Sequence, residues 1–327
     1  MAVLVTGATG FVGAWLTRRL SESGETVHVL HRTNSSLEEL DGVAFVSKIG
    51  DVTDPESVRS ACLDVDTVFH LAGVVGYSKA MRAQMERVNV DGTRNVVDAI
   101  QTGRKPKLVY MSSVVAVGAS FDGRPLDENS TYNVRHLDLG YFETKRKAEE
   151  LVVQACRQDK IDAVILNPST IYGAADAKKG SRKTQLKVAR GEFPFYTGGG
   201  VSVVSVHDVV EAVINARTKG RRGERYILSG ENITIHNLFT RIASLAGAEP
   251  PKIYLPDLVV RAIGKSGDLL EALGKKGPLN TENAWTAILF HWFDNAKARA
   301  ELGFRPRPAQ DALKESVDWM RQKGLLK

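Results

Sequence analysis

Apolar and polar positions follow two different rhythms along the first half of the chain. Short runs rich in β-branched residues predict buried strands, and the stretches between them repeat apolar residues every three or four positions, as an amphipathic helix does. Strands that alternate with helices predict right-handed βαβ units and a parallel sheet with helices on both faces. The strand-like runs lie at 2–5, 26–31, 43–46, 67–71, 107–111 and 161–166.

The pattern changes near residue 170. A basic loop that contains glycine precedes an apolar run with a helix and then a short strand at 225–228, and the last hundred residues are mostly helical in pattern and broken by prolines. We therefore predict an α/β protein in which a Rossmann-type, doubly wound parallel sheet carries a smaller, mostly helical lobe. The predicted boundaries are 1–173 plus about 201–230 for the sheet domain and 174–200 plus about 231–327 for the smaller lobe.

Composition narrows the class of protein. Of the 327 residues, 43% are hydrophobic and 25% are charged, as in ordinary globular proteins. No apolar stretch approaches the length of a membrane span, and residues 1–6 run into a glycine turn without a cleavable signal, so a cytoplasmic location is expected. Cys62 and Cys156 form no CxxC or Cys/His cluster. We expect neither a metal site nor a disulfide.

The charge of the chain indicates which classes of partner to expect. The formal net charge is +6, and the short basic clusters are not interleaved with aromatic residues. We therefore expect no nucleic-acid partner. A modest positive excess suits an anionic cofactor or a small anionic substrate.

Three glycines directly behind the first strand predict a nucleotide site. Residues 6–13 read Thr-Gly-Ala-Thr-Gly-Phe-Val-Gly. A helix N-terminus offers unpaired N–H groups and the positive end of its dipole, which suit a pyrophosphate, and glycine lets the backbone take a positive φ close to the ligand. The GxxGxxG spacing differs from the GxGxxG of the standard dinucleotide motif. A plain strand–helix turn is the alternative.

Two further features carry candidate chemistry. Tyr141 and Lys145 are four residues apart and share one face of a predicted helix. We expect the ammonium to lower the pKa of the phenol, so that Tyr141 acts as a general acid or base; an exposed helical pair is the alternative. Ser113 follows a predicted strand, where its hydroxyl would point into a ligand site and hold a carbonyl oxygen, or else cap a turn.

Taken together and in this order, these motifs resemble the extended short-chain dehydrogenase/reductase family over nearly the whole chain. The resemblance implies that Ser113, Tyr141 and Lys145 are the catalytic set and that Lys145 also binds the nicotinamide ribose. It implies cofactor contacts from the glycine turn, from an adenine-holding pair, from the loop after the fourth strand and from the segment at 167–169. The implied cofactor residues are Gly7, Thr9, Gly10, Phe11, Val12, Gly13, Asp51, Val52, Leu71, Ala72, Gly73, Lys145, Pro168 and Ser169.

The end of the second strand bears on the choice of cofactor. Members of the family that use NAD place an acidic residue there, whereas this chain has His31 followed by Arg32. An acid would repel a 2′-phosphate, and a guanidinium pairs with it. We therefore favour NADP(H) and leave NAD(H) open. A solvated loop cation is the alternative interpretation of Arg32.

The serine motif bears on the branch of the family. Residues 112–118 read Ser-Ser-Val-Val-Ala-Val-Gly, and Asn167 precedes Pro168. Both features resemble dihydroflavonol reductases and 3β-hydroxysteroid dehydrogenases more than sugar-nucleotide enzymes. We expect an oxidoreductase that interconverts a ketone or aldehyde and an alcohol. The alternatives are an NAD-dependent sugar-nucleotide epimerase and a non-catalytic cofactor-sensing protein.

A basic segment at 178–183 gives the clue to the substrate, because the family covers the substrate with this loop. Four of its six residues are cationic, which predicts recognition of a carboxylate, phosphate or coenzyme A group, unless the run is only a solvated surface. Lys178, Arg182 and Tyr77 are the predicted substrate contacts. Aromatic residues at 193–196 would add an apolar wall, so an apolar ring system with a carboxylate, such as a sterol acid, would fit. Many members of the family are dimers, so a homodimer is left open.

Overall fold

One large parallel sheet dominates the structure. The computed structural model describes residues 1–176, 182–275, 277 and 279–326. Within these residues a seven-stranded sheet has the order β10-β6-β5-β4-β1-β2-β3, with every neighbouring pair parallel. The predicted α/β class and parallel sheet are confirmed. The strands are β1 (Ala2–Thr6), β2 (Thr26–His31), β3 (Val46–Ile49), β4 (Thr67–His70), β5 (Lys107–Met111), β6 (Ala163–Pro168) and β10 (Arg225–Leu228).

The third strand corrects one boundary. We predicted it at 43–46, but β3 spans Val46–Ile49 and pairs its last residue with His31 of β2. The apolar residue Phe45 packs against the core from the preceding loop instead. As an edge strand, β3 needs no apolar pattern, and its Val46 and Ile49 side chains are exposed. Pairing with β2, rather than hydrophobicity, sets its register.

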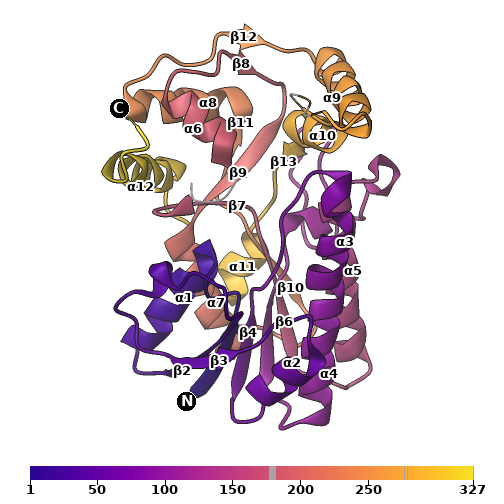
Figure 1. The fold of residues 1–327 in the computed structure, drawn as a ribbon, viewed down its shortest axis with the longest axis vertical. Coiled ribbons are helices and arrows are strands. Elements are labelled where there is room, and N and C mark those ends of the chain that lie inside the picture. Colours follow the sequence, from indigo (N-terminus) through magenta and orange to yellow (C-terminus); the bar gives the residue numbers. More distant parts are fainter. Residues whose placement is uncertain (177–181, 276, 278, 327) are drawn as a thin grey trace.

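Helices cover both faces of this sheet (Figure 1). Successive side chains of a strand point to opposite faces, so Val3 and Val5 of β1 pack in one core with α1 and α7, while Leu4 packs in the other with α2, α4 and α5. A sheet buried on both faces explains why its strands read as continuous apolar runs. The helices are α1 (Phe11–Glu22), α7 (Val206–Lys219) and α11 (Ala296–Glu301) on the first face, and α2 (Pro55–Ala61), α4 (Gly92–Thr102) and α5 (Gly140–Arg157) on the second.

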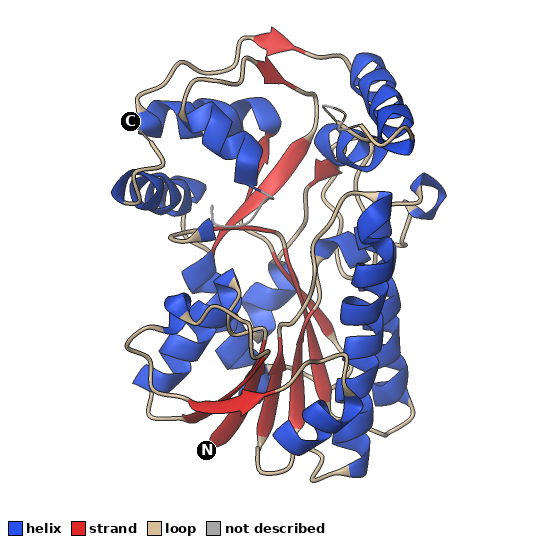
Figure 2. Cartoon of the chain, viewed as in Figure 1, coloured by secondary structure: helices blue, strands red, loops and turns tan. Residues whose placement is uncertain are grey.

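Smaller sheets and helices lie at the other end of the long axis (Figures 1 and 2). Strands β7 (Thr170–Tyr172), β9 (Gly200–Ser205), β11 (Glu231–Thr234) and β13 (Phe290–His291) form one sheet, and β8 (Phe195–Tyr196) pairs with β12 (Ile253–Tyr254). After β9 the chain returns to the large sheet through α7 and β10. The helices of this end are α6 (Lys183–Ala189), α8 (Ile235–Ala246), α9 (Asp257–Ala272), α10 (Thr281–Ile288) and α12 (Ala309–Gln322).

Short helical turns complete the connections. The four-residue helix α3 (Arg82–Met85) continues into η3 (Glu86–Asp91) and then into α4. The other turns are η1 (Glu38–Leu40), η2 (Lys79–Met81), η4 (Val114–Ala116) and η5 (Arg135–Leu137). In the part of the chain that is described, no helix combines the length and the apolar character needed to cross a membrane. Cys62 and Cys156 are both buried and unpaired with each other.

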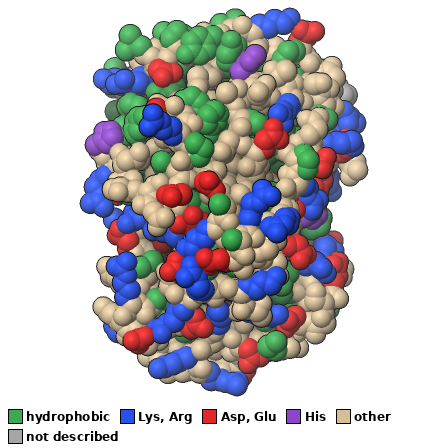
Figure 3. All heavy atoms as spheres, turned by 180° about the vertical axis from the view of Figure 1, so that it is seen from behind, with side chains coloured by type: hydrophobic (Ala, Val, Ile, Leu, Met, Phe, Trp, Pro, Cys, Tyr) green, Lys and Arg blue, Asp and Glu red, His purple; other side chains and the backbone are tan. Residues whose placement is uncertain are grey.

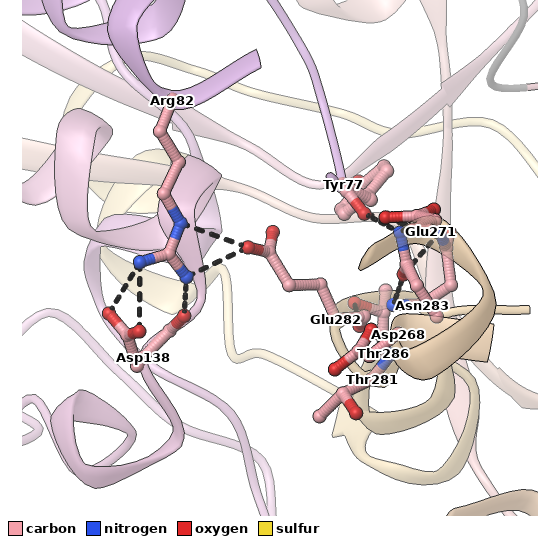
Figure 4. Close-up of polar contacts among 10 residues, drawn as sticks. Tyr77, Arg82, Asp138, Asp268, Glu271, Thr281, Glu282, Asn283 and Thr286 are labelled. Carbon is pink, nitrogen blue, oxygen red and sulfur yellow. Dashed lines mark hydrogen bonds and ion pairs between the residues drawn. The ribbon is translucent and has the colours of Figure 1, made fainter. Parts of the chain in front are cut away.

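An arginine ties the two ends of the molecule together (Figure 4). Arg82 of α3 donates to the carboxylate of Asp138 at 2.8 Å, just before α5 begins, and to Glu282 of α10 at 2.9 Å. The Glu282 side chain is only 6% exposed. Because the Glu282 carboxylate has so little contact with solvent, removing Arg82 would leave its charge uncompensated. We call this contact the Arg82 clasp; it fixes the start of α5 against the smaller end.

The turn after β1 gives the first prediction. Gly7 and Gly24 have nearly the same backbone conformation, with φ of +76° and +78°, but a Cβ on Gly7 would lie 2.6 Å from the backbone nitrogen of Ala72, whereas Gly24 has open space. Gly24→Ala should cost roughly 1–2 kcal/mol of strain. Gly7→Ala should cost about 1–3 kcal/mol more because backbone must move. Urea unfolding of both variants checks this, and equal losses would contradict it.

Candidate active site

A cavity of about 580 Å³ lies at the carboxyl ends of the parallel strands, between the large sheet and the smaller end of the molecule. Residues that directly follow β1, β4, β5 and β6 line it, namely Gly7, Leu71, Ser112 and Ser169. The order of the strands reverses between β1 and β4, and ligands of open α/β sheets bind at such a reversal.

The glycine turn leaves the first turn of α1 free to bind an anion. Gly10 is the N-cap of α1 without a side-chain cap, and the first turn carries no acidic residue. The Gly10 N–H donates to the Gly7 carbonyl at 2.9 Å, which closes the turn. A Cβ on Gly13 would lie 2.1 Å from that same carbonyl, so helix and turn touch closely. Free N–H groups at the positive end of a twelve-residue helix, beside the cavity, suit the pyrophosphate of a dinucleotide.

Lys145 lies buried beneath the cavity. Its side chain donates to the Met111 carbonyl at 2.8 Å and to the Tyr110 hydroxyl at 3.5 Å, and the residue is only 5% exposed. Burial lowers the pKa of this ammonium to about 8, and the Glu149 carboxylate opposes that shift. Lys145 is therefore an ammonium at neutral pH that loses its proton in mildly alkaline solution.

Tyr141 and Ser113 line the same cavity as Lys145. Burial raises the pKa of the Tyr141 phenol, the nearby Tyr77 raises it further, and the Ser113 hydroxyl lowers it. We expected Lys145 to lower this pKa; the structure instead gives a raised one, because desolvation dominates and the ammonium is directed to the Met111 carbonyl. The Ser113 hydroxyl also accepts from the Val115 N–H at 3.4 Å, as a cap of η4. The capping and ligand-facing interpretations of Ser113 are thus compatible.

The predicted cofactor residues divide into two groups. Ten of them line the cavity: Gly7, Gly10, Phe11, Val12, Gly13, Leu71, Gly73, Lys145, Pro168 and Ser169. The others lie outside its lining: Thr9, His31, Arg32, Asp51, Val52 and Ala72. Of these, His31 ends β2, and Asp51 follows the neighbouring strand β3. The second group therefore lies at or near the edge of the sheet formed by the carboxyl ends of its strands. The adenosine half of a dinucleotide would extend along this edge.

His31 and Asp51 already have local partners. The His31 ring contacts the Ser47 hydroxyl at 2.7 Å, and the Asp51 carboxylate accepts from the Thr53 N–H at 2.9 Å. The Arg32 carbonyl accepts from the Ser35 N–H at 3.0 Å, but its exposed side chain has no hydrogen bond or ion pair within the described residues. Arg32 is thus the charged group at the end of β2 that is available to a ligand.

The far side of the cavity is aromatic and apolar. Tyr77 packs edge-on against Tyr141, with ring centroids 6.0 Å apart. Its carbonyl accepts from Asn280 at 2.5 Å and from Asn283 at 3.4 Å, which ties its loop to α10 (Figure 4). Residues of β8, α8 and α9, and Leu255 between β12 and α9, add apolar side chains. Apart from the aromatic run at 193–196, sequence reasoning did not assign these residues to the site; they include Leu238, Phe239, Leu255, Val260 and Ile263.

Arg182 is the charged group of this wall. Its side chain is 12% exposed and lies 4.0 Å from the centre of the Tyr172 ring. It also donates to the Ile171 carbonyl and lies 3.8 Å from the buried carboxylate of Asp176. Arg182 therefore lines the cavity, with a counter-charge that the sequence did not reveal. Lys178 lies outside the described residues.

Comparisons with known proteins decide the family. Residues 3–229 match the model of the NAD dependent epimerase/dehydratase family. The chain is 31% identical to sterol demethylase protein B of Methylococcus capsulatus over the whole of both chains, and 31% identical to a putative dihydroflavonol 4-reductase of Synechocystis over 99% of this chain and 95% of that one. The crystal structure of gox2253 is 34% identical and matches 100% of this chain and 99% of its own, with a TM-score of 0.88.

The chain belongs to the NAD-dependent epimerase/dehydratase family. The resemblance to extended short-chain dehydrogenase/reductases is thereby confirmed. The family binds NAD(P), and the glycine turn, the uncapped first turn of α1 and the cavity beside them fit such a dinucleotide.

In this family member a buried carboxylate lies one helical turn beyond Lys145. Glu149 has no exposed surface and forms an ion pair with Arg225 of β10. It also accepts from the Ser112 hydroxyl and from the Asn167 amide, both at 2.6 Å. The same amide donates to the Ser113 carbonyl at 2.9 Å. Sequence reasoning missed Glu149, although it extends the spacing of Tyr141 and Lys145 by a further four residues.

This carboxylate gives the second prediction. Glu149 favours the charged form of Lys145, so Glu149→Gln should lower the pKa of Lys145 below about 8. Since the ammonium would then be lost at lower pH, the alkaline limit of turnover should move to lower pH. The pH dependence of turnover with a reduced or oxidised nicotinamide cofactor measures this.

The neighbouring Glu150 provides the control. It pairs with Arg146 on the half-exposed side of α5, so Glu150→Gln should leave the alkaline limit unchanged. A mere loss of packing in Glu149→Gln would lower turnover at every pH without moving the limit, and that result would contradict the electrostatic role.

Proposed function

We propose that the protein is an NADP(H)-preferring oxidoreductase that interconverts a ketone or aldehyde and the corresponding alcohol on an apolar substrate. One observation supports this most strongly: Ser113, Tyr141 and Lys145 line the same cavity as the anion-binding turn of α1. A proton donor, a hydroxyl and a buried ammonium beside a dinucleotide site are the groups that carbonyl reduction requires.

Each of the three side chains has a role that its surroundings suit. When bound, the nicotinamide exchanges a hydride with the carbon of the substrate carbonyl. The raised pKa of Tyr141 keeps its phenol protonated, so in the reducing direction it gives its proton to the carbonyl oxygen. Ser113 donates a hydrogen bond to that oxygen. Lys145, an ammonium below about pH 8, stabilises the negative charge that Tyr141 acquires and holds the ribose.

The preference for NADP(H) rests on the end of β2. His31 is engaged with Ser47, and Arg32 is exposed and unpaired within the described residues. An NAD-specific site would need an acidic side chain here to accept the ribose hydroxyls. A guanidinium instead attracts a 2′-phosphate.

The cavity wall supports a proposal for the substrate class. The aromatic run at 193–196, together with Leu238 and Phe239, provides apolar surface for a ring system, and two relatives at 31% identity carry the names sterol demethylase protein B and putative dihydroflavonol 4-reductase. We propose a sterol-like substrate whose polar group faces Arg182. Asp176 already compensates the charge of Arg182, so a neutral hydrogen-bond acceptor would suit this position as well as a carboxylate. Arg182 is the one residue on which the choice of a carboxylate depends.

The third prediction tests the proton donor. Tyr141→Phe removes the phenol but keeps the ring, so turnover should fall about 10²–10⁴-fold. Binding of NADPH should change little, since Lys145 and the glycine turn remain. Tyr132→Phe is the matched control, because the Tyr132 hydroxyl donates to Glu143 at 2.7 Å and does not line the cavity. Near-normal turnover of Tyr141→Phe would refute the assignment.

The same assay separates the proposal from the two alternatives. A reductase consumes NADPH in proportion to product, which the absorbance of the reduced nicotinamide reports. An epimerase would copurify with NAD(H) and consume no cofactor overall. A cofactor sensor would bind the dinucleotide without turnover of any aldehyde, ketone or sterol acid.

The fourth prediction tests the cofactor preference. Arg32→Ala removes the charge-assisted contact to the 2′-phosphate, so the KM for NADPH should rise about tenfold or more, while that for NADH should stay nearly constant. Arg19→Ala is the control, since Arg19 is an exposed residue of α1 that pairs with Glu211. Equal effects of Arg32→Ala on both cofactors would contradict a preference set by this residue.

A further inference from the structure

The outer face of α9 is unusually apolar for a surface helix. Leu258, Leu269 and Leu273, the last just after the helix ends, are 76%, 65% and 66% exposed. With Ala262 they recur at the spacing of one helical face. The exposed Ile253 and Tyr254 of β12 extend this apolar surface at the start of the helix. Seen from behind, apolar side chains gather over this end of the molecule (Figure 3). A cluster of this kind marks an interaction site.

The inner face of α9 explains why these side chains point outward. Gly264 and Gly267 bring α9 into close contact with α10 and the segment before it, because a Cβ on Gly267 would lie 1.7 Å from the Leu279 carbonyl. Val260 and Ile263 line the cavity. The helix therefore separates the cavity from the exterior by its own width, about 10 Å. Its leucines contribute little to the core.

Most charges of α9 are sorted by face. Two of its three acidic side chains turn toward α10: Asp268 accepts from the Thr281 N–H at 3.0 Å, and Glu271 lies 3.4 Å from the Asn280 amide (Figure 4). Asp257, the first residue of the helix, is exposed. Lys265 lies among the exposed leucines and Lys275 follows them, and neither has an ion pair within the described residues. Apart from Asp257 at its first position, the outer surface of α9 is therefore apolar and cationic.

We propose that the outer face of α9 docks on the surface of an anionic lipid bilayer. Leu258, Leu269 and Leu273 would enter the boundary between headgroups and acyl chains, while Lys265 and Lys275 contact lipid phosphates. Amphipathic helices that lie in the membrane interface carry this combination of leucine and lysine. Anionic lipids attract each nearby lysine, and the attraction is screened by salt.

The same charges argue against a second copy as the occupant. A two-fold dimer places the same patch on both partners. Lys265 lies near the middle of the patch, so it would then meet the same lysine of an identical face. A bilayer instead places lipid phosphates beside both lysines.

Docking stands apart from the proposed reaction, because it rests on surface residues alone. If the proposed function also holds, docking would place one wall of the cavity against the bilayer, in which an apolar substrate dissolves. Failure of vesicle binding would leave that reaction untouched, and failure of the reaction would leave the docking surface intact.

The fifth prediction is measured by sedimentation of the full chain with large unilamellar vesicles. Vesicles of phosphatidylcholine with phosphatidylglycerol should bind it about tenfold or more tightly than phosphatidylcholine alone. The triple variant Leu258→Gln, Leu269→Gln, Leu273→Gln should lose binding, and Lys265→Glu with Lys275→Glu should lose the preference for phosphatidylglycerol. High salt should weaken binding of the unaltered chain.

A matched triple variant provides the control. Val46, Ile49 and Leu63 are 42%, 67% and 53% exposed on the large-sheet end, so Gln at these positions should leave vesicle binding unchanged. All variants should keep the thermal unfolding temperature of the unaltered chain. The proposal is overturned if the unaltered chain stays in the supernatant, if the α9 triple variant still sediments, or if light scattering shows a dimer that this variant converts to a monomer without vesicle binding.

Discussion

The burial of a charged lysine is the constraint on which this structure depends. Lys145 is 5% exposed, and removing an ammonium from water is expensive unless hydrogen bonds and opposite charge replace the lost hydration. The Met111 carbonyl, the Tyr110 ring at 5.1 Å from the ammonium and the Glu149 carboxylate supply that replacement. These groups come from β5 and α5, so the lysine stays charged only where helix and sheet keep their mutual position.

The strand that returns the chain to the large sheet therefore supplies one of the charges near this lysine. Arg225 lies at the start of β10, which joins the sheet after the chain has passed through β9 and α7. Its ion pair neutralises Glu149, which in turn is bonded to Ser112 and Asn167. An edge strand remote in sequence thus supplies the counter-charge of a buried carboxylate on α5.

The sequence reveals the parts of the site that depend on local geometry. The glycine turn and the spacing of Tyr141 and Lys145 follow from a strand–turn–helix and from the helical period. The outer wall of the cavity does not, because Leu238, Val260 and Ile263 are ordinary apolar residues that only tertiary packing brings there. The direction of the Tyr141 pKa could not be predicted either, since desolvation depends on that packing. Lys145 finds its closest partner in a backbone carbonyl, which no side-chain pattern can signal.

The Arg82 clasp limits how much the width of the cavity can change. It joins α3, the start of α5 and α10 at one corner through contacts of 2.8 and 2.9 Å. A corner held by partly buried charges keeps its spacing, because opening it would expose uncompensated charge. We therefore expect a change in cavity width to arise elsewhere in the lining, which includes Gln185 of α6 and Phe195 of β8. The clasp thus constrains the position of Tyr141, the second residue of α5, more directly than it constrains the width of the cavity.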